Sequence, residues 1–541
     1  MVMIRISNIK LKLSHTNNDL LCAASKKLHI DKEKISGLTI VKQSLDARDK
    51  NNIYYTYSVD VETNIKDIKP SLLKSSDISL SPEKRYILPE HETHVFCKGR
   101  PLVAGSGPAG LFCAYLLSEY GYKPVLLERG EDVENRDKTI KDFWETGRLK
   151  PESNVQFGEG GAGTFSDGKL NTGINDKSGR VDLVKKIFIE HGAPPEIAYC
   201  NKPHLGTDNL KKIIASMRET IIKNGGTVLF NTAFKKFIIE GDVLKGIKAE
   251  CGGTEFTINT DILVLAIGHS ARDTFEYLIN KTPLNITSKP FAVGVRIEHD
   301  REMINRSQYG EDYLLKFPEI SDSNLYRAAD YKLTYKTRQG NDIYSFCMCP
   351  GGFVVNSSSE EKRLCINGMS NYGRDSATSN SAIVMAVNPS DSPYLNILYQ
   401  RRLEETAYNE CGGRIVSQLF SDFEQNRLSK DFASITPSHK GLTGFGNINN
   451  ILGKKICSEI CEAVNSFSMR LKGFNAPDAV ISAIEARTSS PLRILRDEKF
   501  ESAIKGVFPC GEGAGYAGGI TSAAVDGIKI FEEIYRRYIP F

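Results

Sequence analysis

Three stretches of the sequence share the spacing G-x-G-x-x-G, which lets a backbone turn sharply against a phosphate. In a dinucleotide site the first glycine permits the tight turn, the second lets the backbone approach the pyrophosphate, and the third lets a helix pack on a strand. A helix that begins at such a turn offers free N–H groups and a partial positive charge to the phosphates. The spacing alone is weak, so its surroundings decide which stretch does this chemistry. The three stretches are Gly105, Gly107 and Gly110; Gly158, Gly160 and Gly163; and Gly513, Gly515 and Gly518.

The first stretch has the surroundings that a dinucleotide-binding turn needs. The apolar run PLVA precedes it, the helical pattern LFCAYLLSEY follows it, and the next apolar run, VLLE, ends in Glu128. A carboxylate at that place can accept hydrogen bonds from ribose hydroxyls. A glycine turn can also merely join a strand to a helix, but the flanks and the acid together favour dinucleotide binding. We therefore expect these residues to bind the cofactor: Gly105, Ser106, Gly107, Pro108, Ala109, Gly110, Glu128 and Arg129.

The far end of the chain indicates FAD rather than NAD. The segment GVFPCGEGAGYAGGITSAAVDGIKI repeats the order of strand, glycine turn and helix. It resembles the segment that returns to the flavin end of an extended FAD in glutathione-reductase-like flavoproteins. A helix N-terminus there would stabilise the anion formed when the flavin takes up two electrons. The chain departs from the pattern at Glu512, where those proteins usually carry an aspartate on a ribityl hydroxyl. The resemblance implies cofactor contacts from Gly511, Glu512, Gly518, Gly519 and Ile520.

Two further stretches are similar to flavoprotein segments. LVLAIGHSA resembles the short apolar strand whose closing turn, here at Gly268, lies beside the cofactor. The glycine-rich GEGGAGTFSDGKLNTG corresponds to a loop that passes the ribityl chain and the flavin. This implies contacts from Gly160, Gly161, Gly163 and Thr164. A flexible surface loop is the alternative for this stretch, and we favour flavin contact.

Taken together, the chain resembles the uncharacterised FAD-dependent dehydrogenases, often labelled NAD(FAD)-utilising dehydrogenases. The motifs GSGPAGLFCAYLL, GEGGAGTFSDGKLNTG, EARTSSPLRILRD, CGEGAGYAGGITSAAVDG and SLDARDKNNIYYTYSVDVE carry this likeness across most of the chain. It implies non-covalent FAD and an enzyme that passes a hydride between an unidentified organic substrate and flavin N5, to which NADH or NADPH could serve as a transient electron donor. The alternatives are a flavin monooxygenase, a prenyl-type reductase, or a non-catalytic FAD-binding protein whose N-terminal domain docks a partner.

The candidates for a catalytic role are Arg487 and His269. Arg487 could clamp a carboxylate or lie against the flavin, although an exposed or helix-capping arginine is equally common. His269 could act as a general acid, although a lone histidine is more often structural. In a flavin disulfide reductase, a redox-active cysteine pair typically lies soon after the first FAD-binding glycine turn. Because the pairs Cys347/Cys349 and Cys457/Cys461 lie far from it, we interpret them as structural thiols. The histidines have no metal-site spacing, so we expect no metal.

Composition indicates a globular protein of several domains. The 541 residues are 40% hydrophobic and 25% charged, with a formal charge of +4, so a nucleic-acid partner is not expected. No apolar run reaches the length of about 18 residues that spans a bilayer, and the start, MVMIRISNIKLKL, lacks the apolar core of a signal peptide. The twelve cysteines lack any CxxC and suit a reducing compartment. We expect a cytoplasmic protein that acts on a small molecule and is not inserted in a membrane.

The motifs divide the chain into parts that must come together. We predict an α/β fold: a Rossmann-like FAD-binding domain of glutathione-reductase type, an inserted α+β substrate domain and a small N-terminal α+β domain. Within the last part, AVISAIEAR predicts a helix before the returning strand. The predicted ranges are 1–95 for the N-terminal domain, 96–284 for the first FAD-binding part, 285–474 for the substrate or cap domain, and 475–541 for the C-terminal FAD-binding part.

Overall fold

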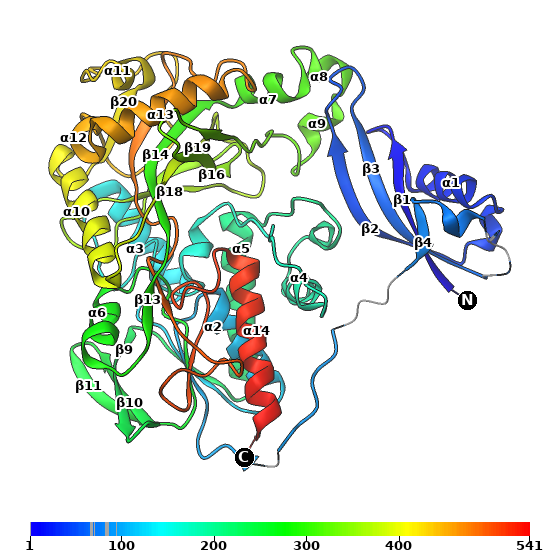
Figure 1. The fold of residues 1–541 in the computed structure, drawn as a ribbon. Coiled ribbons are helices and arrows are strands. Elements are labelled where there is room, and N and C mark those ends of the chain that lie inside the picture. Colours follow the sequence, from blue (N-terminus) through cyan, green and yellow to red (C-terminus); the bar gives the residue numbers. More distant parts are fainter. Residues whose placement is uncertain are drawn as a thin grey trace.

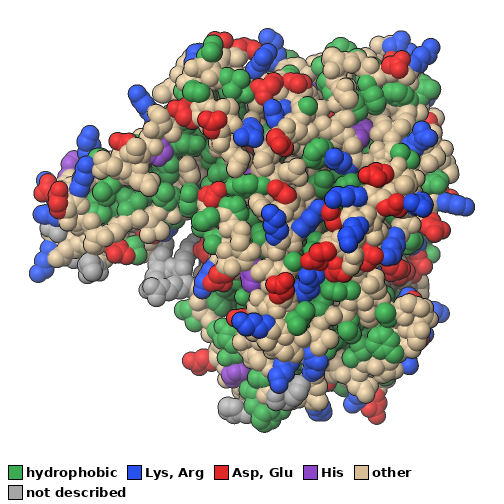
Figure 2. Space-filling view, turned by 180° about the vertical axis from the view of Figure 1, so that it is seen from behind, with side chains coloured by type: hydrophobic (Ala, Val, Ile, Leu, Met, Phe, Trp, Pro, Cys, Tyr) green, Lys and Arg blue, Asp and Glu red, His purple; other side chains and the backbone are tan. Residues whose placement is uncertain are grey.

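The computed structural model describes residues 2–64, 66, 69, 71–81, 86–93 and 95–540. A small N-terminal body stands beside a larger one, in which a parallel sheet and its helices lie below a broad mixed sheet (Figure 1). After the N-terminal body, the chain reaches the far end of the molecule, where β5 (Val95–Phe96) pairs with β26 (Tyr538–Ile539). On the face seen in Figure 2, basic and acidic side chains are interspersed.

The N-terminal body is an antiparallel sheet with one helix on it. Its strand order is β2-β3-β1-β4, and the alternating apolar residues of β1 and β3 pack against α1. Thr16 and Asp19 form a capping box that starts α1. Gln43 joins this body to the larger one by exchanging backbone hydrogen bonds with Tyr199 and Asn201. The elements are β1 (Val2–Leu11), α1 (Asn17–Leu28), β2 (Gly37–Asp46), β3 (Tyr54–Thr63) and β4 (Ile78–Leu80).

A parallel sheet of order β25-β12-β6-β7-β8 forms the centre of the larger body. Parallel strands are covered on both faces, which explains why they appear in the sequence as short apolar runs. The strands are β6 (Leu102–Ala104), β7 (Val125–Leu127), β8 (Thr227–Leu229), β12 (Leu263–Leu265) and β25 (Val507–Pro509).

Helices from both ends of this part cover one face of the parallel sheet. α2 (Pro108–Glu119) packs against both α5 (Gly206–Lys223) and α14 (Ile520–Arg537). β25 and α14 therefore lie in the same layers as the first glycine turn, which confirms the α/β, Rossmann-like fold. The other face packs on a second core, which includes α6 (Arg272–Lys281) and an antiparallel sheet of β9 (Thr232–Glu240), β10 (Val243–Cys251) and β11 (Thr254–Asn259).

The broad sheet has seven strands in the order β15-β16-β19-β14-β23-β20-β22. Figure 1 shows helices around it, such as α10 (Pro393–Cys411) and α13 (Lys454–Phe467). Its strands are β14 (Phe291–Asp300), β15 (Thr334–Lys336), β16 (Asp342–Cys349), β19 (Thr378–Val387), β20 (Ile415–Leu419), β22 (Thr443–Phe445) and β23 (Val480–Glu485). A smaller sheet beside it holds β17 (Phe353–Asn356), β18 (Ile366–Met369) and β21 (His439–Lys440).

The predicted helix in AVISAIEAR is wrong, because Val480–Glu485 forms β23. This strand is buried at every residue and pairs with both β14 and β20. A short apolar run buried on all sides has no polar face, so its periodicity does not separate helix from strand. β23 also lies within the range 475–541 that we predicted for the returning FAD-binding part, yet it belongs to the broad sheet.

The remaining elements connect these layers. Among the described residues, the helices lack the length and apolar character that crossing a bilayer requires. These elements are α3 (Val133–Thr146), α4 (Arg180–Glu190), α7 (Arg301–Tyr309), α8 (Tyr313–Lys316), α9 (Glu319–Asp322), α10 (Pro393–Cys411), α11 (Phe420–Glu424), α12 (Ile448–Leu452), α13 (Lys454–Phe467), the pair β13 (Ile286–Ser288) and β24 (Leu492–Ile494), and the 3₁₀ turns at Lys32–Lys34, Leu72–Lys74, Ala162–Phe165 and Pro195–Ala198.

Candidate functional site

A cavity of about 420 Å³ lies where the parallel sheet meets the broad sheet. Its volume is in the range of ligand and cofactor sites. The cavity is lined by the first glycine turn, the glycine-rich stretch 156–171, the start of α14, and the edges of β16 and β23. Of the residues predicted from sequence, those in its lining are Gly105, Gly107, Pro108, Ala109, Glu128, Arg129, Gly161, Gly163, Gly268, His269, Arg487, Glu512, Gly518, Gly519 and Ile520.

The other predicted cofactor residues stand behind this lining. Ser106 and Thr164 are fully buried, and a side chain at Gly110 would overlap the carbonyl oxygen of Gly105. A Cβ on Gly511 would lie 2.6 Å from the Cβ of Ala109, so this glycine lets the C-terminal turn pack on α2. The fifth such residue is Gly160, whose N–H donates to Ser106 O at 3.0 Å. These residues shape the cavity wall from outside it.

The first glycine turn has the form of a phosphate cradle. Gly105 has a φ of +104°, and a side chain there would overlap the backbone of Ala266. At Gly107, in contrast, there is room for a Cβ, because its nearest atom would be Gly161 Cα, 3.8 Å away. Because α2 begins at Pro108, its N-terminus lies at this open part of the cavity. Open space above a glycine at a helix N-terminus fits the pyrophosphate of a dinucleotide.

Glu128 ties three backbone segments together beneath the cavity. Its Oε2 accepts from the N–H and Oγ of Ser106 at 3.0 and 2.6 Å, and its Oε1 accepts from Gly130 N at 2.9 Å and Gly158 N at 3.0 Å. The predicted contact of Glu128 with ribose hydroxyls stays a prediction. The structure adds that this carboxylate also fixes both glycine-rich loops, a role that the motif alone did not indicate.

The stretch that begins at Gly158 is held firmly, which excludes the alternative of a flexible surface loop. Gly158, Gly160 and Gly161 all have positive φ. Beneath them Arg136 is fully buried, and its guanidinium donates to backbone carbonyls, including Gly161 O at 2.9 Å and Asn154 O at 2.9 Å. Sequence reasoning missed Arg136, because an arginine within a helix pattern gives no sign that it is buried.

Arg129 stands at the same end of the cavity as Glu128. Its Nε donates to Glu152 at 2.8 Å and its Nη1 to Asp273 at 3.0 Å. The guanidinium also lies 4.3 Å from the centre of the Phe157 ring. Two carboxylates and one ring thus hold a flat cation at the edge of the cavity, where it can contact a cofactor.

His269 and Glu512 lie together at the end of the cavity where the C-terminal segment predicts the flavin. His269 Nδ1 lies 3.3 Å from Glu512 Oε1. Within the described part of the chain, the buried Nε2 of His269 has no hydrogen-bond partner. A Cβ on Gly518 would meet no atom within 4 Å, and α14 begins at Ile520. An open cradle at Gly518 and a lining residue with an unsatisfied ring nitrogen therefore both lie at this end, and they fit a bound ring with polar edges.

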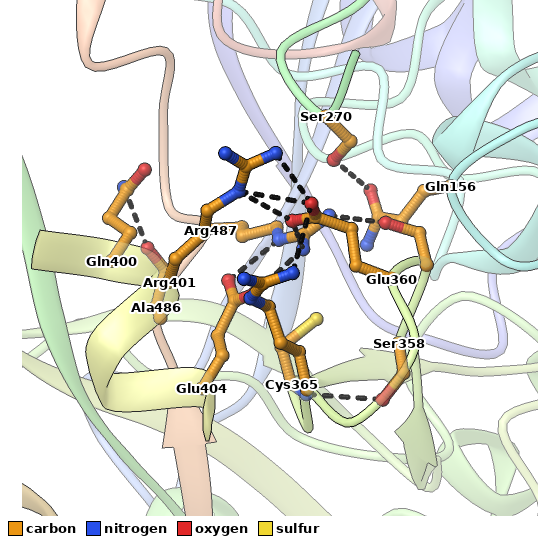
Figure 3. A network of polar contacts seen from close by, with 12 residues as sticks. Gln156, Ser270, Ser358, Glu360, Cys365, Gln400, Arg401, Glu404, Ala486 and Arg487 are labelled. Atoms are coloured by element: carbon orange, nitrogen blue, oxygen red, sulfur yellow. Dashed lines mark hydrogen bonds and ion pairs between the residues drawn. The ribbon is translucent and has the colours of Figure 1, made fainter. Parts of the chain in front are cut away.

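Arg487 does clamp a carboxylate, but the carboxylate belongs to the protein. Its Nε and Nη2 each donate to Glu404 at 2.7 Å, and its Nη1 donates to Ser359 Oγ at 2.5 Å. Glu360 bridges this pair to Arg401 at 2.7 Å, and Figure 3 shows these groups as one connected network. The predicted role of Arg487 towards a substrate stays a prediction.

Arg272 adds a further buried cation beside this network. It is 2% exposed, and among the described residues its three guanidinium nitrogens have no hydrogen-bond partner. Burial and the nearby Arg487 lower the pKa of Arg272 to about 10. No pattern in the sequence indicated this arrangement.

The wall formed by the broad sheet carries ionisable groups that sequence reasoning did not select. Glu485 lines the cavity, and its Oε2 accepts from Arg296 Nε at 2.8 Å. Burial raises the pKa of Glu485 to about 7, although the charge of Arg296 opposes this. Cys347 lines the same wall, with Lys169 opposite it from the glycine-rich stretch. Arg296 is fully buried and also donates to Asn380 Oδ1 at 2.7 Å and Asn367 Oδ1 at 3.1 Å.

Comparison with known families gives matches over three parts of the chain. The family described as "FAD-dependent protein, C-terminal domain-like" matches residues 290–488, which include all seven strands of the broad sheet. A NAD(P)-binding Rossmann-like domain matches residues 103–141, and a domain of unknown function matches residues 3–62. An uncharacterised protein of Clostridium beijerinckii is 44% identical over 543 residues, which cover 99% of both chains.

Solved structures give a much looser likeness. L-proline dehydrogenase from P. horikoshii is 12% identical, with a TM-score of 0.32, over 81% of this chain and 94% of that one. A geranylgeranyl bacteriochlorophyll reductase-like protein from Thermoplasma acidophilum is also 12% identical, with a TM-score of 0.33, over 80% and 77% of the two chains. The flavin-dependent halogenase CmlS is 11% identical, with a TM-score of 0.36, over 82% and 59%. TM-scores this low carry no argument about which activity the chain has.

Proposed function

The chain belongs to a family of FAD-dependent proteins, and we propose that it is an FAD-dependent dehydrogenase or reductase that passes a hydride between a small organic substrate and flavin N5. The observation that carries this is the cavity. It joins the glycine cradle at Gly107, the start of α14 and a wall of ionisable side chains from the broad sheet. A bound flavin would supply the two-electron chemistry, and the protein supplies binding, orientation and proton transfer.

The binding roles follow from which groups surround each part of the cavity. The N–H groups at the start of α2 would hold the pyrophosphate, and the start of α14 would place a partial positive charge at the flavin. We assign Gly511 and Gly160 to packing rather than to contact, since neither lies in the lining. The predicted contact of Glu512 is supported by its place in the lining beside His269.

Glu485 is the group best placed to carry the substrate proton. Within the described residues its Oε1 accepts no hydrogen bond, while Arg296 fixes Oε2 at 2.8 Å. With a pKa raised to about 7, this carboxyl can both hold and release a proton near neutral pH. Hydride transfer from an alcohol or amine carbon needs such a proton acceptor on the substrate side.

We also propose a cytoplasmic location, with a small-molecule substrate and NADH or NADPH as the transient electron donor. All twelve cysteines are free thiols, as expected in a reducing compartment. On the face seen in Figure 2 basic and acidic side chains are interspersed, and the formal charge of the whole chain is only +4, so we propose no nucleic-acid partner.

The experiment is to purify the protein, load it with FAD, and mix it with NADH or NADPH without oxygen. We expect about one FAD per chain and loss of the yellow colour with one of the two nicotinamides. Oxygen consumption coupled to product formation would instead support a flavin monooxygenase. Failure to retain FAD, or colour that persists with both donors, would contradict the proposal.

A further inference from the structure

We propose that Cys347 and Cys349 form a redox-active dithiol on the cavity wall, which accepts two electrons and two protons from reduced FAD and passes them to a small disulfide substrate. This inference rests on the proposed function, because a flavin must occupy the cavity. It also reverses the interpretation of this pair as structural thiols, which rested on its distance in sequence from the first glycine turn.

The fold brings this pair to the cavity although the sequence separates it from the cofactor motifs. Cys347 and Cys349 end β16, where a bulge between Phe346 and Cys349 interrupts the pairing with β19. Cys347 has a φ of +42° and lines the cavity, while Cys349 is fully buried behind it. The Sγ of Cys349 donates to Cys347 O at 3.4 Å, and each thiol shifts the pKa of the other.

The surroundings of the pair are closely packed. A Cβ on Gly368 would lie 2.7 Å from Cys349 Sγ and would overlap the guanidinium of Arg296. Glycine at this position therefore allows the second thiol and the arginine to occupy the same layer. The pair cannot move away from the cavity without displacing Arg296 and its partner Glu485.

Two cations stabilise a thiolate at this place. Lys169 donates through Nζ to Met348 O, the carbonyl between the two cysteines, and forms an ion pair with Asp167 at 3.0 Å. Arg296 Nη1 donates to Cys347 O at 3.3 Å. The neighbouring Cys349 thiol and the charges of Lys169 and Arg296 hold the pKa of Cys347 well below that of an ordinary thiol, while the Cys347 side chain and burial raise the pKa of Cys349.

One thiolate beside one protonated thiol is the arrangement that thiol–disulfide exchange uses. In the oxidised pair the two Sγ atoms are bonded to each other. Two electrons and two protons from reduced FAD break that bond and yield two thiols, of which Cys347 ionises, while the flavin becomes oxidised. The Cys347 thiolate then attacks a small disulfide R–S–S–R. This attack expels one R–S⁻, which takes up the proton that Cys347 released, and leaves a mixed disulfide on Cys347. Cys349 then attacks the mixed disulfide and loses its own proton, which restores the protein disulfide and releases the second R–SH.

Cys457 and Cys461 provide a matched control within the same chain. They lie one turn apart on α13, both are buried, and neither lines the cavity. Burial raises the pKa of both thiols to about 12. Because this pair lies outside the cavity lining and both thiols have raised pKa values, it has the features of structural cysteines.

The test is an anaerobic reductive titration of the FAD-loaded protein after oxidation by diamide and desalting, with the flavin reduced by light and EDTA. We expect the wild type to take up two electron pairs per FAD and the Cys347→Ser variant to take up one, a twofold loss. The Cys457→Ser/Cys461→Ser variant should take up two pairs. Alkylation followed by peptide mass spectrometry should find Cys347 and Cys349 bonded before reduction and alkylated after it, and unchanged by light when FAD is omitted.

Uptake of a single electron pair by the wild type would overturn the inference, as would a Cys347–Cys349 peptide that diamide leaves as free thiols. The wild-type result stands even if a variant folds poorly, and Cys349→Ala provides a second variant. If FAD binds and bleaches normally while the pair stays inert, the dithiol fails and the proposed function survives. If FAD does not bind, the proposed function fails first.

Discussion

The two ends of the cavity are built from different parts of the polypeptide. Around Gly107 and Gly161 the lining is mostly backbone. A side chain added there would either overlap neighbouring protein atoms or occupy the space proposed for the ligand. On the wall of β16 and β23 the lining is side chains such as Cys347 and Glu485, held by the buried Arg296. We expect the first end to be the more sensitive of the two to added volume. The second end is sensitive to the loss of a charge partner.

The largest effect should come from breaking a buried ion pair at the second end. In Arg487→Ala, Glu404 would stay buried without its partner, since it is 1% exposed and accepts two hydrogen bonds from Arg487. We expect the free energy of unfolding to fall by about 3–5 kcal/mol, measured by urea denaturation. The control is Arg402→Ala, because Arg402 is exposed and lies on α10, the helix that carries Glu404. Equal stability of the two variants would contradict the comparison.

A somewhat smaller loss should follow from added volume at the first end. In Gly110→Ala the new methyl group would overlap the carbonyl oxygen of Gly105, and α2 would have to move away from the turn. We expect a loss of about 1–3 kcal/mol from overpacking, in the same denaturation assay. Gly173→Ala should have little effect, because Gly173 is exposed and its Cβ would meet no atom within 4 Å. A Gly110→Ala variant as stable as the control would show that the turn is not packed as described.

The smallest effect per pH unit concerns the pH dependence of stability, to which each end contributes one carboxyl. Burial raises the pKa of Glu159, in the glycine-rich stretch, and of Glu485 from about 4.5 to about 7. The folded protein therefore keeps protons that the unfolded chain has already released, and stability falls as pH rises from about 4.5 to about 7. Each group contributes a slope of about 1 kcal/mol per pH unit.

Glu485→Gln should remove about half of that slope, and the exposed Glu361→Gln should leave it unchanged. The measurement is the free energy of unfolding at several pH values across this window. A slope that is the same in Glu485→Gln and in the wild type would show that Glu485 is ionised throughout.

The first end of the cavity could be predicted from sequence because it is local. The turn from Gly105 to Gly110 and the acid at Glu128 lie within one strand-turn-helix-strand unit, and each residue type has one physical reason to be there. The returning segment near Gly518 could be added because it repeats the same order of elements. What stayed hidden even here was Arg136, whose five carbonyl partners depend on how a loop folds over a helix.

The second end could not be predicted because its residues are brought together by strand pairing. Arg296 on β14 and Glu485 on β23 are distant in sequence and adjacent in the sheet. The strand that carries Glu485 was itself interpreted as a helix. Cys347 was dismissed because its distance along the chain was taken as distance in space. A sequence motif reflects residues that lie close together along the chain, and the residues of this wall do not.

The central claim is that the space above Gly107 is reserved for the pyrophosphate of FAD, and Gly107→Ala tests it most directly. The new methyl group would approach protein no closer than 3.8 Å, so the free energy of unfolding should stay within about 1 kcal/mol of the wild type. The measurement is the Kd for FAD of the FAD-free protein, followed by flavin fluorescence. We expect Gly107→Ala to raise it by about tenfold or more while Gly173→Ala leaves it unchanged. An unaltered Kd in a folded Gly107→Ala protein would contradict the account.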